Sequence, residues 1–527
     1  MRLGIALVTL CVFAASACVR PFLQPAVETG QAARGETPAP AAESIRLVPL
    51  LSGTRPIRGG LIWTGSGPNL SARGASCADD EALWYCAEDR WLVGENRRLR
   101  ITSPTTDPDR LLIAADLGIT VRFGDGARSF VYLGDSAGRP ASGGCGTAHP
   151  LATCNDAVLV VDPSDLDPAD GVTAEVAVVE LPGGRPEGFL PLVIPGINGA
   201  DPLRRCRIIE RARGAPCLGP FNVPTGATAV RLPAALLPGA DAGAAGDADA
   251  VLLFYGTAIT RRERASWLAI SADGFRFAKL REGPFSREKF IQVAPVPLRA
   301  AQRAAVCAAE PSSPLCEGAL GLRGDAVLLF GTGETYREGR LYLGVIRLDD
   351  LAVRYYRLDP GTGRETWVED EGGATPIIDD DRPAQERFGE LAVTLVGAEA
   401  CPAEERGRCA DTLVLLANQN GLVRYRTAPL ASPGRGWSAS RRTSGRGYGP
   451  YVLDAFTRVA PGAGGALELV LYHLVSAWNG RAPDAPDRAP YGVFTRRLRL
   501  VDEATCHTGD GNEPLCGELA PPWPPGP

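Results

Sequence analysis

Two aspartates in the stretch Ala115–Asp135 have the residue type and spacing that acid–base chemistry requires. The stretch reads ADLGITVRFGDGARSFVYLGD, in which two apolar runs flank a Gly-Asp-Gly turn, a pattern that predicts a β-hairpin. Asp116 and Asp135 then lie at its open end, where cross-strand neighbours are about 5 Å apart and diagonal ones about 7–8 Å. Such a pair suits glycoside hydrolysis, in which one carboxyl group donates a proton and the other attacks carbon or activates water.

The same acids also have a purely structural interpretation. Asp116 could cap a strand end, and Asp135 could form an Asx turn with Ser136, because acids commonly flank turns. The sequence leaves both interpretations open at this point, along with the question of which acid would donate the proton.

Three further residues are weaker candidates for contacts with a ligand. Glu390 follows Phe-Gly and precedes an apolar run, so it could face the mouth of a channel; a structural glutamate paired with an arginine is an equal alternative. Trp478 and Tyr255 end apolar runs and could form platforms on which sugars stack, although packing in the core is the commoner fate of such rings.

Five related apolar runs indicate the framework that positions these residues. They read FVYLGD (130–135), DAVLLFYGT (249–257), DAVLLFGTGE (325–334), DTLVLLANQN (411–420) and LELVLYHLVS (467–476). Most are followed by a second strand-like run, and long helical periodicity is nearly absent. Repeated strand-and-turn units predict an all-β fold, a five-bladed β-propeller with loop insertions over residues 46–505. A pair of β-sandwiches or an irregular solenoid is the alternative.

A propeller also needs a strand that ties its first and last blades together. We expect this strand to come from residues 46–100, which contain Ile62-Trp63-Thr64 and Trp91-Leu92-Val93.

The beginning of the chain resembles a secretory leader. Arg2 precedes an apolar run that ends in small residues directly before Cys18, as in a bacterial signal peptide with a lipobox over residues 1–18. Lipidation of Cys18 would anchor the protein to a membrane, with ordinary cleavage nearby as the alternative. Residues 19–45, rich in Ala and Pro, predict a disordered tether, and residues 506–527 a C-terminal tail. We therefore expect a protein of the bacterial cell envelope, lipid-anchored or secreted. We also expect it to be a monomer.

Twelve of the 14 cysteines form close sequential couples. They are Cys77/Cys86, Cys145/Cys154, Cys206/Cys217, Cys307/Cys316, Cys401/Cys409 and Cys506/Cys516. The short, uniform spacing favours six local disulfides that staple loop insertions, as suits an oxidising compartment. No CxxC occurs and the three histidines are scattered, so we expect no metal and no cofactor. A net charge of −6 argues against a nucleic-acid partner.

Several motifs, in the same order, resemble those of the DUF4185 family. Ala115–Ser136 resembles its opening DLG and GDT segments, RFGELAV (387–393) its GE segment, and GLVRYRTAPLASPGRGW (421–437) its RTA and GW segment. GPYVLDAF (449–456), LYHLVSAWN (471–479) and YGVFTRRLRL (491–500) resemble its closing motif, so the likeness covers about residues 110–500. Ser136 stands where Thr is usual, residues 480–490 interrupt the closing motif, and the cysteine-bearing insertions are not typical of the family.

The resemblance implies a five-bladed propeller and, for some members, an activity. Part of the family is classed as glycoside hydrolase family 183, endo-D-arabinanases in which two aspartates of the DLG and GD[ST] segments are catalytic; the matching positions are Asp116 and Asp135. We therefore expect a glycoside hydrolase that acts on a cell-envelope or extracellular polysaccharide, with D-arabinan as one candidate. The alternative is a non-catalytic surface propeller that binds glycan or protein.

Overall fold

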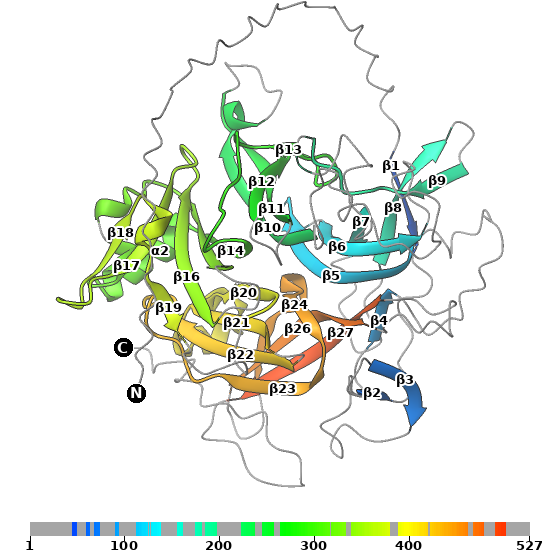
Figure 1. The fold of residues 1–527 in the computed structure, drawn as a ribbon. Helices are drawn as coiled ribbons and strands as arrows, with labels where there is room; N and C mark the ends of the chain where they lie inside the picture. The colour runs from blue at the N-terminus through cyan, green and yellow to red at the C-terminus, as the bar shows by residue number, and fades with distance from the viewer. Residues whose placement is uncertain are drawn as a thin grey trace, which may run out of the picture. The chain divides into compact units, whose positions relative to one another are not determined.

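Five antiparallel β-sheets surround one axis in the structure of the chain, a computed structural model (Figure 1). The structure describes residues 45–49, 60–63, 68–73, 90–93, 112–124, 126, 128–138, 155–161, 174–181, 185–195, 197, 223–237, 245–257, 264–316, 318–333, 339–379, 388–419, 422–461, 467–478 and 491–501. All of these belong to one unit, Ser44–Pro527.

The first three sheets, or blades, follow one another along the chain. Blade 1 contains β5 (Leu112–Phe123), β6 (Arg128–Gly138), β7 (Asn155–Val161) and β8 (Ala174–Leu181), with β1 (Ile45–Pro49) and β9 (Arg185–Phe189) both beside β8. Blade 2 contains β10 (Val223–Pro233), β11 (Asp247–Thr257), β12 (Ala265–Ser271) and β13 (Ala278–Lys279). Blade 3 contains β14 (Gln292–Leu298), β15 (Ala326–Thr332), β16 (Arg340–Arg347), β17 (Val353–Leu358) and β18 (Glu365–Val368), with β19 (Pro376–Asp379) beside β16.

The last two blades complete the ring. Blade 4 contains β20 (Leu391–Val396), β21 (Thr412–Gln419), β22 (Leu422–Pro429) and β23 (Arg441–Arg446). Blade 5 contains β24 (Tyr448–Val452) and β25 (Arg458–Pro461), both paired with β26 (Leu467–Trp478), then β27 (Tyr491–Val501) and β4 (Arg90–Val93). Within the described ranges the helices are α2 (Ala300–Ala309) and the 3-10 turns η4 (Ala234–Leu236), η5 (Pro314–Cys316), η6 (Gly318–Leu320), η7 (Glu371–Gly373), η8 (Ala398–Ala400), η9 (Ala403–Arg408) and η10 (Asp454–Phe456).

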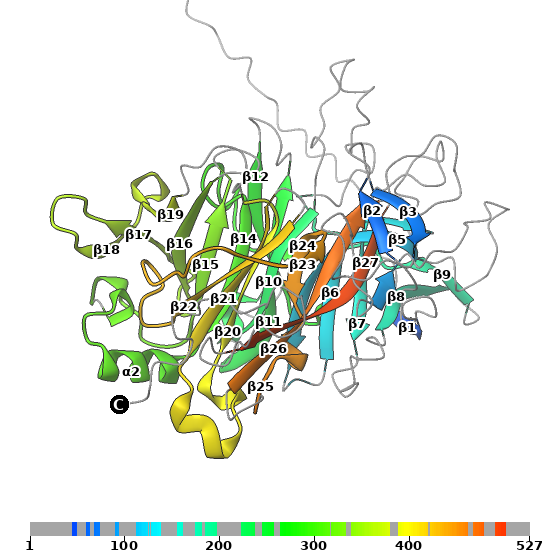
Figure 2. The same ribbon diagram turned by 90° about the horizontal axis from the view of Figure 1, so that it is seen from below.

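The first strand of each blade lines the axis. β5, β10, β14, β20 and β24 pack against one another in that order, and β24 returns to β5 (Figure 1). Figure 2 shows the blades from the side. Five apolar cores fill the spaces between the sheets, and each is built mainly from two neighbouring blades. Such a closed ring is a propeller rather than a sandwich or a solenoid, so the predicted fold is confirmed.

The five related apolar runs are the second strands of the blades, β6, β11, β15, β21 and β26. β15 and β21 are buried along their whole length. Both faces of each blade pack on a neighbour, which is why these strands are continuously apolar instead of alternating.

The hairpin predicted around the two acids is also confirmed. β5 and β6 are antiparallel, with Val121 opposite Phe130 near the turn and Asp116 opposite Gly134 at the open end. Asp135 directly follows Gly134, so both acids lie at this end. Shifts in register along the first half of β5 interrupt the ladder there, as β-bulges do where a strand must re-aim its side chains.

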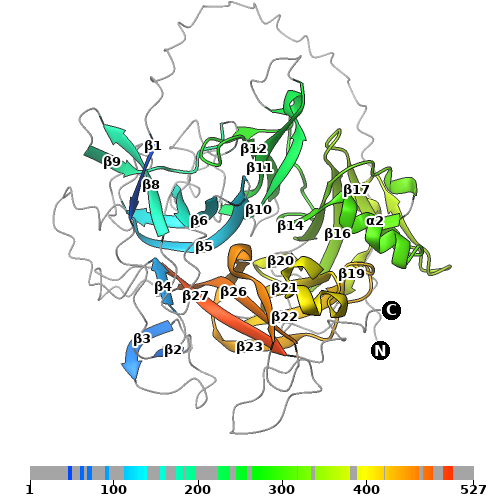
Figure 3. The same cartoon turned by 180° about the vertical axis from the view of Figure 1, so that it is seen from behind.

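The ring is closed by a strand from the N-terminal part of the chain. β4 pairs with β27 and becomes the outermost strand of blade 5, with Trp91 opposite Phe494 (Figure 3). This confirms the closing role expected of Trp91-Leu92-Val93. Ile62 and Trp63 lie instead in a separate hairpin of β2 (Gly60–Trp63) and β3 (Pro68–Arg73).

Two of the six expected disulfides lie within the described residues and are confirmed. Cys307–Cys316 joins α2 to η5, and Cys401–Cys409 encloses η9. The other four couples, the leader with Cys18, the tether and the C-terminal tail lie outside the described residues. No helix in the described part of the chain is long and apolar enough to cross a membrane.

Gly226 lies on the inner strand β10, where a side chain has no room. An added Cβ atom would overlap the carbonyl oxygen of Val293 and lie 2.6 Å from Cδ of Pro295, both on β14. Gly226→Ala is therefore expected to lower the free energy of unfolding by about 1–3 kcal/mol in denaturant titrations. Gly324→Ala is the control, because no heavy atom lies within 4 Å of a Cβ there. Equal stability of the two variants would contradict this close approach of blades 2 and 3.

Candidate functional site

Four acidic residues gather at the end of the axis where the inner strands begin. Asp116 lies near the start of β5, Glu390 directly precedes β20, and Asp135 and Asp156 lie on β6 and β7 of blade 1. The negative charges of the other three all disfavour ionisation of Asp116. The structure thus brings together the three acids singled out in the sequence and adds a fourth, Asp156.

Asp116 is the most desolvated of the acids that were predicted from the sequence. Its side chain is 7% exposed; Oδ2 accepts a hydrogen bond of 3.1 Å from the Tyr448 hydroxyl, and Oδ1 has no partner among the described residues. Burial, followed by repulsion from Asp135, raises the pKa of Asp116 well above its usual range, whereas the bond from Tyr448 lowers it. A protonated carboxylic acid is therefore favoured at a pH where an exposed aspartate is ionised.

Asp135 differs from Asp116 in exposure and in backbone conformation. Its side chain is partly exposed, and its φ of 40° lies in the left-handed region, which few residues other than Gly, Asn and Asp adopt. The backbone N–H of Asp135 donates a hydrogen bond of 3.1 Å to Oδ1 of Asp156, which holds the strained residue in place.

Asp156 was not predicted from the sequence. It is fully buried near the start of β7, and its Oδ2 accepts a hydrogen bond of 2.8 Å from the Tyr255 hydroxyl. A signal was present, since an acid that opens the apolar run AVLVV must lie at a strand end or find buried partners.

Tyr255 does not form the open platform considered from the sequence. Its ring is fully buried in the core between blades 1 and 2, and it contacts Asp156 through its hydroxyl group. A ring with no exposed face cannot stack on a sugar, so this part of the prediction was wrong. The position at the end of an apolar strand was right, but the strand end is covered by the neighbouring blade.

The structure describes the side chain of Glu390 but not that of Trp478. Glu390 is half-buried, and its Oε2 accepts a hydrogen bond of 2.6 Å from Nδ2 of Asn418; among the described residues no arginine pairs with it. Trp478 ends β26 opposite Tyr491, and its side chain lies outside the described part of the structure. No three His, Cys, Asp or Glu side chains within the described ranges are arranged to hold a metal ion.

Comparisons with known proteins add no identification. No protein-family model and no curated protein sequence matches the chain, so the resemblance to the DUF4185 family remains a prediction.

Solved structures that resemble the chain include three proteins that act on glycans. An N-acetylgalactosamine deacetylase from F. plautii, in complex with blood group B trisaccharide, is 12% identical over 79% of this chain and 96% of that chain, with a TM-score of 0.36. A glycoside hydrolase of family 32 from Bifidobacterium adolescentis is 11% identical over 76% and 56%, with a TM-score of 0.34. An ulvan lyase of polysaccharide lyase family 25 is 10% identical over 86% and 87%, with a TM-score of 0.28. At these scores the likenesses carry no argument about substrate or residues.

The environment of Asp116 predicts a pH-dependent gain in stability for Asp116→Asn. Because its pKa is raised in the folded protein, the folded state binds more protons than the unfolded state once the pH exceeds about 3.9, and the wild-type free energy of unfolding falls as the pH rises. Asparagine does not titrate, so the melting temperature of Asp116→Asn should gain more at pH 7 than at pH 4.

The control is Asp247→Asn, which removes one exposed acid at the start of β11. A gain for Asp116→Asn that is equal at both pH values, or larger at pH 4, would contradict the raised pKa.

Proposed function

We propose that the protein is a glycoside hydrolase that cuts a polysaccharide of the cell envelope or its surroundings, with Asp116 and Asp135 as the catalytic pair. The observation that carries this proposal is the contrast between the two acids. Asp116 is buried with a raised pKa, and its neighbour Asp135 is partly exposed. Two adjacent carboxyl groups in unlike environments can divide the roles of acid and base at one pH.

In this mechanism Asp116 is the proton donor. Its proton passes to the glycosidic oxygen as the bond from that oxygen to the anomeric carbon breaks. Asp135 then acts on the opposite side, either by attacking the anomeric carbon or by taking a proton from the water that attacks it. The first route is completed by water, whose proton returns to Asp116, and retains the anomeric configuration; the second inverts it.

Residues around the pair hold it in place. Asp156 anchors the backbone of Asp135 and is itself held by Tyr255, while Tyr448 fixes the orientation of the Asp116 carboxyl group. Glu390, oriented by Asn418, and Trp478 are the residues that we propose to contact the substrate at the rim.

The substrate and the location rest on the sequence. The resemblance to endo-D-arabinanases favours a furanose-containing glycan such as D-arabinan. The two disulfides suggest a compartment outside the cytoplasm, where a lipid on Cys18 would keep the protein beside its polysaccharide.

Asp116→Asn and Asp135→Asn should each lower the release of reducing ends from D-arabinan by a factor of about 10² to 10⁴, because each removes a group that transfers a proton or attacks carbon. The assay should include a panel of other glycans. Asp349→Asn, which changes an exposed acid on blade 3, is the matched control and should retain full activity. If wild type releases nothing from any glycan, while both site variants bind glycan as wild type does, the protein is a binding propeller and the enzyme proposal is wrong.

Tyr448→Phe tests which acid donates the proton. The lost hydrogen bond stabilised the ionised form of Asp116, so the pKa of that group should rise. If Asp116 must be protonated, the alkaline limb of the pH profile of kcat/KM moves to higher pH. A limb that stays in place in an otherwise active variant would assign the proton donor to another residue.

A further inference from the structure

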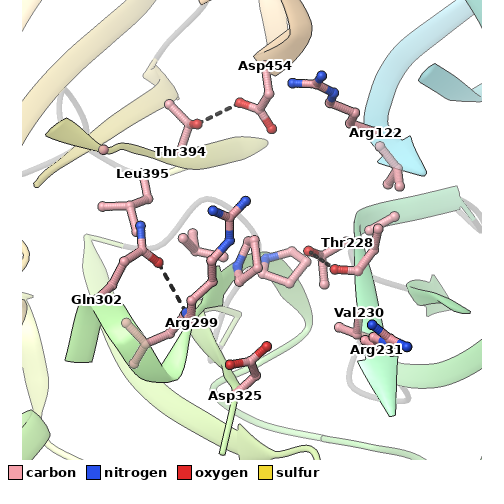
Figure 4. A pocket seen from close by; sticks show the side chains of 18 of the residues that line it. Arg122, Thr228, Val230, Arg231, Arg299, Gln302, Asp325, Thr394, Leu395 and Asp454 are labelled. Carbon is pink, nitrogen blue, oxygen red and sulfur yellow. Dashed lines mark hydrogen bonds between the residues drawn. The ribbon is translucent and has the colours of Figure 1, made fainter. Parts of the chain in front are cut away.

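A pocket lies at the opposite end of the axis from the four acids. It has a volume of about 780 Å³ and is lined mainly by the middle and later residues of the inner strands and by the residues that follow them (Figure 4). Arg122 on this side and Asp116 on the other are six positions apart on β5, a separation of at most about 20 Å along the strand. A volume of this size is typical of small-ligand sites.

The two ends of the axis are separated by a constriction. Between them the inner strands leave a cavity of about 40 Å³, lined by residues that include Ile119, Gly226 and Tyr451. That space has room for water and none for a sugar ring. A sugar ring in this pocket therefore has no room to pass through this cavity toward Asp116.

Each blade contributes a charged residue to this pocket. They are Arg122 from blade 1, Arg231 from blade 2, Arg299 from blade 3, Glu399 from blade 4 and Asp454 from blade 5. Both described disulfides lie in the loops that follow inner strands, Cys307–Cys316 after β14 and Cys401–Cys409 after β20, next to Arg299 and Glu399. These crosslinks restrain the loops that form the wall of the pocket.

The charges form couples of opposite sign. Arg122 faces Asp454 and lowers its pKa, against a larger rise caused by burial (Figure 4). Arg231 is the cross-strand neighbour of Asp249, and Arg299 lies 3.8 Å from Glu399. The remaining acid of the described lining, Asp325, accepts a hydrogen bond from the backbone N–H of Ala300 at the start of α2.

None of these three couples forms a close hydrogen-bonded ion pair within the described structure, so each arginine keeps donors, and each acid keeps acceptors, for a ligand. The three couples balance in charge, and Asp325 adds one further acid to the described lining, so the pocket has only a small net negative field. Such a field disfavours a strongly anionic ligand and attracts a cationic one only weakly. Hydroxyl groups both donate and accept, and therefore match such couples. No aromatic side chain is among the described lining residues, so hydrogen bonds rather than ring stacking would hold the ligand.

We propose that this pocket is a second, non-catalytic binding site for an uncharged saccharide, held by the couple Arg122 and Asp454 together with Arg231 and Arg299. The site is independent of the acids at the other end of the axis. It would keep the protein on a glycan regardless of what happens at Asp116 and Asp135.

The test measures saccharide binding to the full-length protein carrying Asp116→Asn and Asp135→Asn, which prevents turnover. The probes are a D-arabinofuranosyl oligosaccharide, maltoheptaose, and an acidic oligogalacturonate with the same number of sugar units as maltoheptaose. Binding of each probe is measured by calorimetry and by saturation-transfer NMR. We expect an uncharged probe to bind, and Arg122→Ala or Asp454→Asn to weaken it about 10-fold or more. Arg357→Ala, an exposed arginine on β17 far from the pocket, should leave binding unchanged.

Four outcomes would overturn the proposal. These are binding of none of the uncharged probes, a preference for oligogalacturonate, an equal loss of binding in the Arg357→Ala control, and binding that survives both Arg122→Ala and Arg231→Ala. In the last case the saccharide sits at the acidic end instead. Asp454 also accepts a hydrogen bond from Thr394, so Asp454→Asn could lose stability as well as binding. In that case Arg122→Ala and Arg231→Ala decide the result, because both arginine side chains are exposed. Failure of the hydrolase proposal is read separately, from product release by wild type.

Discussion

The packing of five inner strands around one axis is the constraint on which the rest of the structure depends. Each blade begins at the axis and is covered on both faces by its neighbours, so all five inner strands start at one end of the axis and finish at the other. The starts bring Asp116, Glu390 and Tyr448 together, although they lie far apart in the sequence. The opposite ends of the inner strands bring together Arg122, Arg299 and Asp454. One topological rule therefore creates two chemically different ends.

The two ends of the axis differ in how charged side chains are arranged. At the start of the inner strands, acids are placed near one another and one of them is buried, which disfavours ionisation and is costly to the folded state. Hydrogen bonds to Asp156 and from Tyr448 hold this arrangement in place. At the far end, each arginine of the described lining has an acidic neighbour. The first environment suits the movement of a proton, and the second suits the recognition of a neutral, hydroxyl-rich surface.

The sequence predicted the parts of the structure that depend on local patterns. The hairpin of Asp116 and Asp135 follows from alternation and a glycine-containing turn, and the second strands follow from apolar runs that only burial on both faces explains. Asp156 was missed because its contact with Asp135 depends on how β7 pairs with β6. Tyr255 was misjudged because a strand end reveals nothing about the blade that covers it.

The sequence also did not predict the electrostatic environments of Asp116 and of Arg122 and Asp454. Besides its burial, the pKa of Asp116 depends on Glu390 from blade 4 and Tyr448 from blade 5, both far from it in the sequence. The opposing charges of Arg122 and Asp454 come from the first and last blades, with no shared motif. Long-range placement of this kind is set by the closed ring and by nothing within either segment.

The strand that closes the ring has a consequence for how the protein is made. β4 lies near the beginning of the propeller sequence and β27 at its end, so blade 5 cannot be completed until nearly the whole chain has been synthesised. Until then β4 and the face of blade 1 that packs on blade 5 lack their partners, and the ring has an open seam. A chain cut short before β27 would leave that seam permanently exposed to proteases and to pairing with other chains. Only a chain that includes β27 can therefore close the ring.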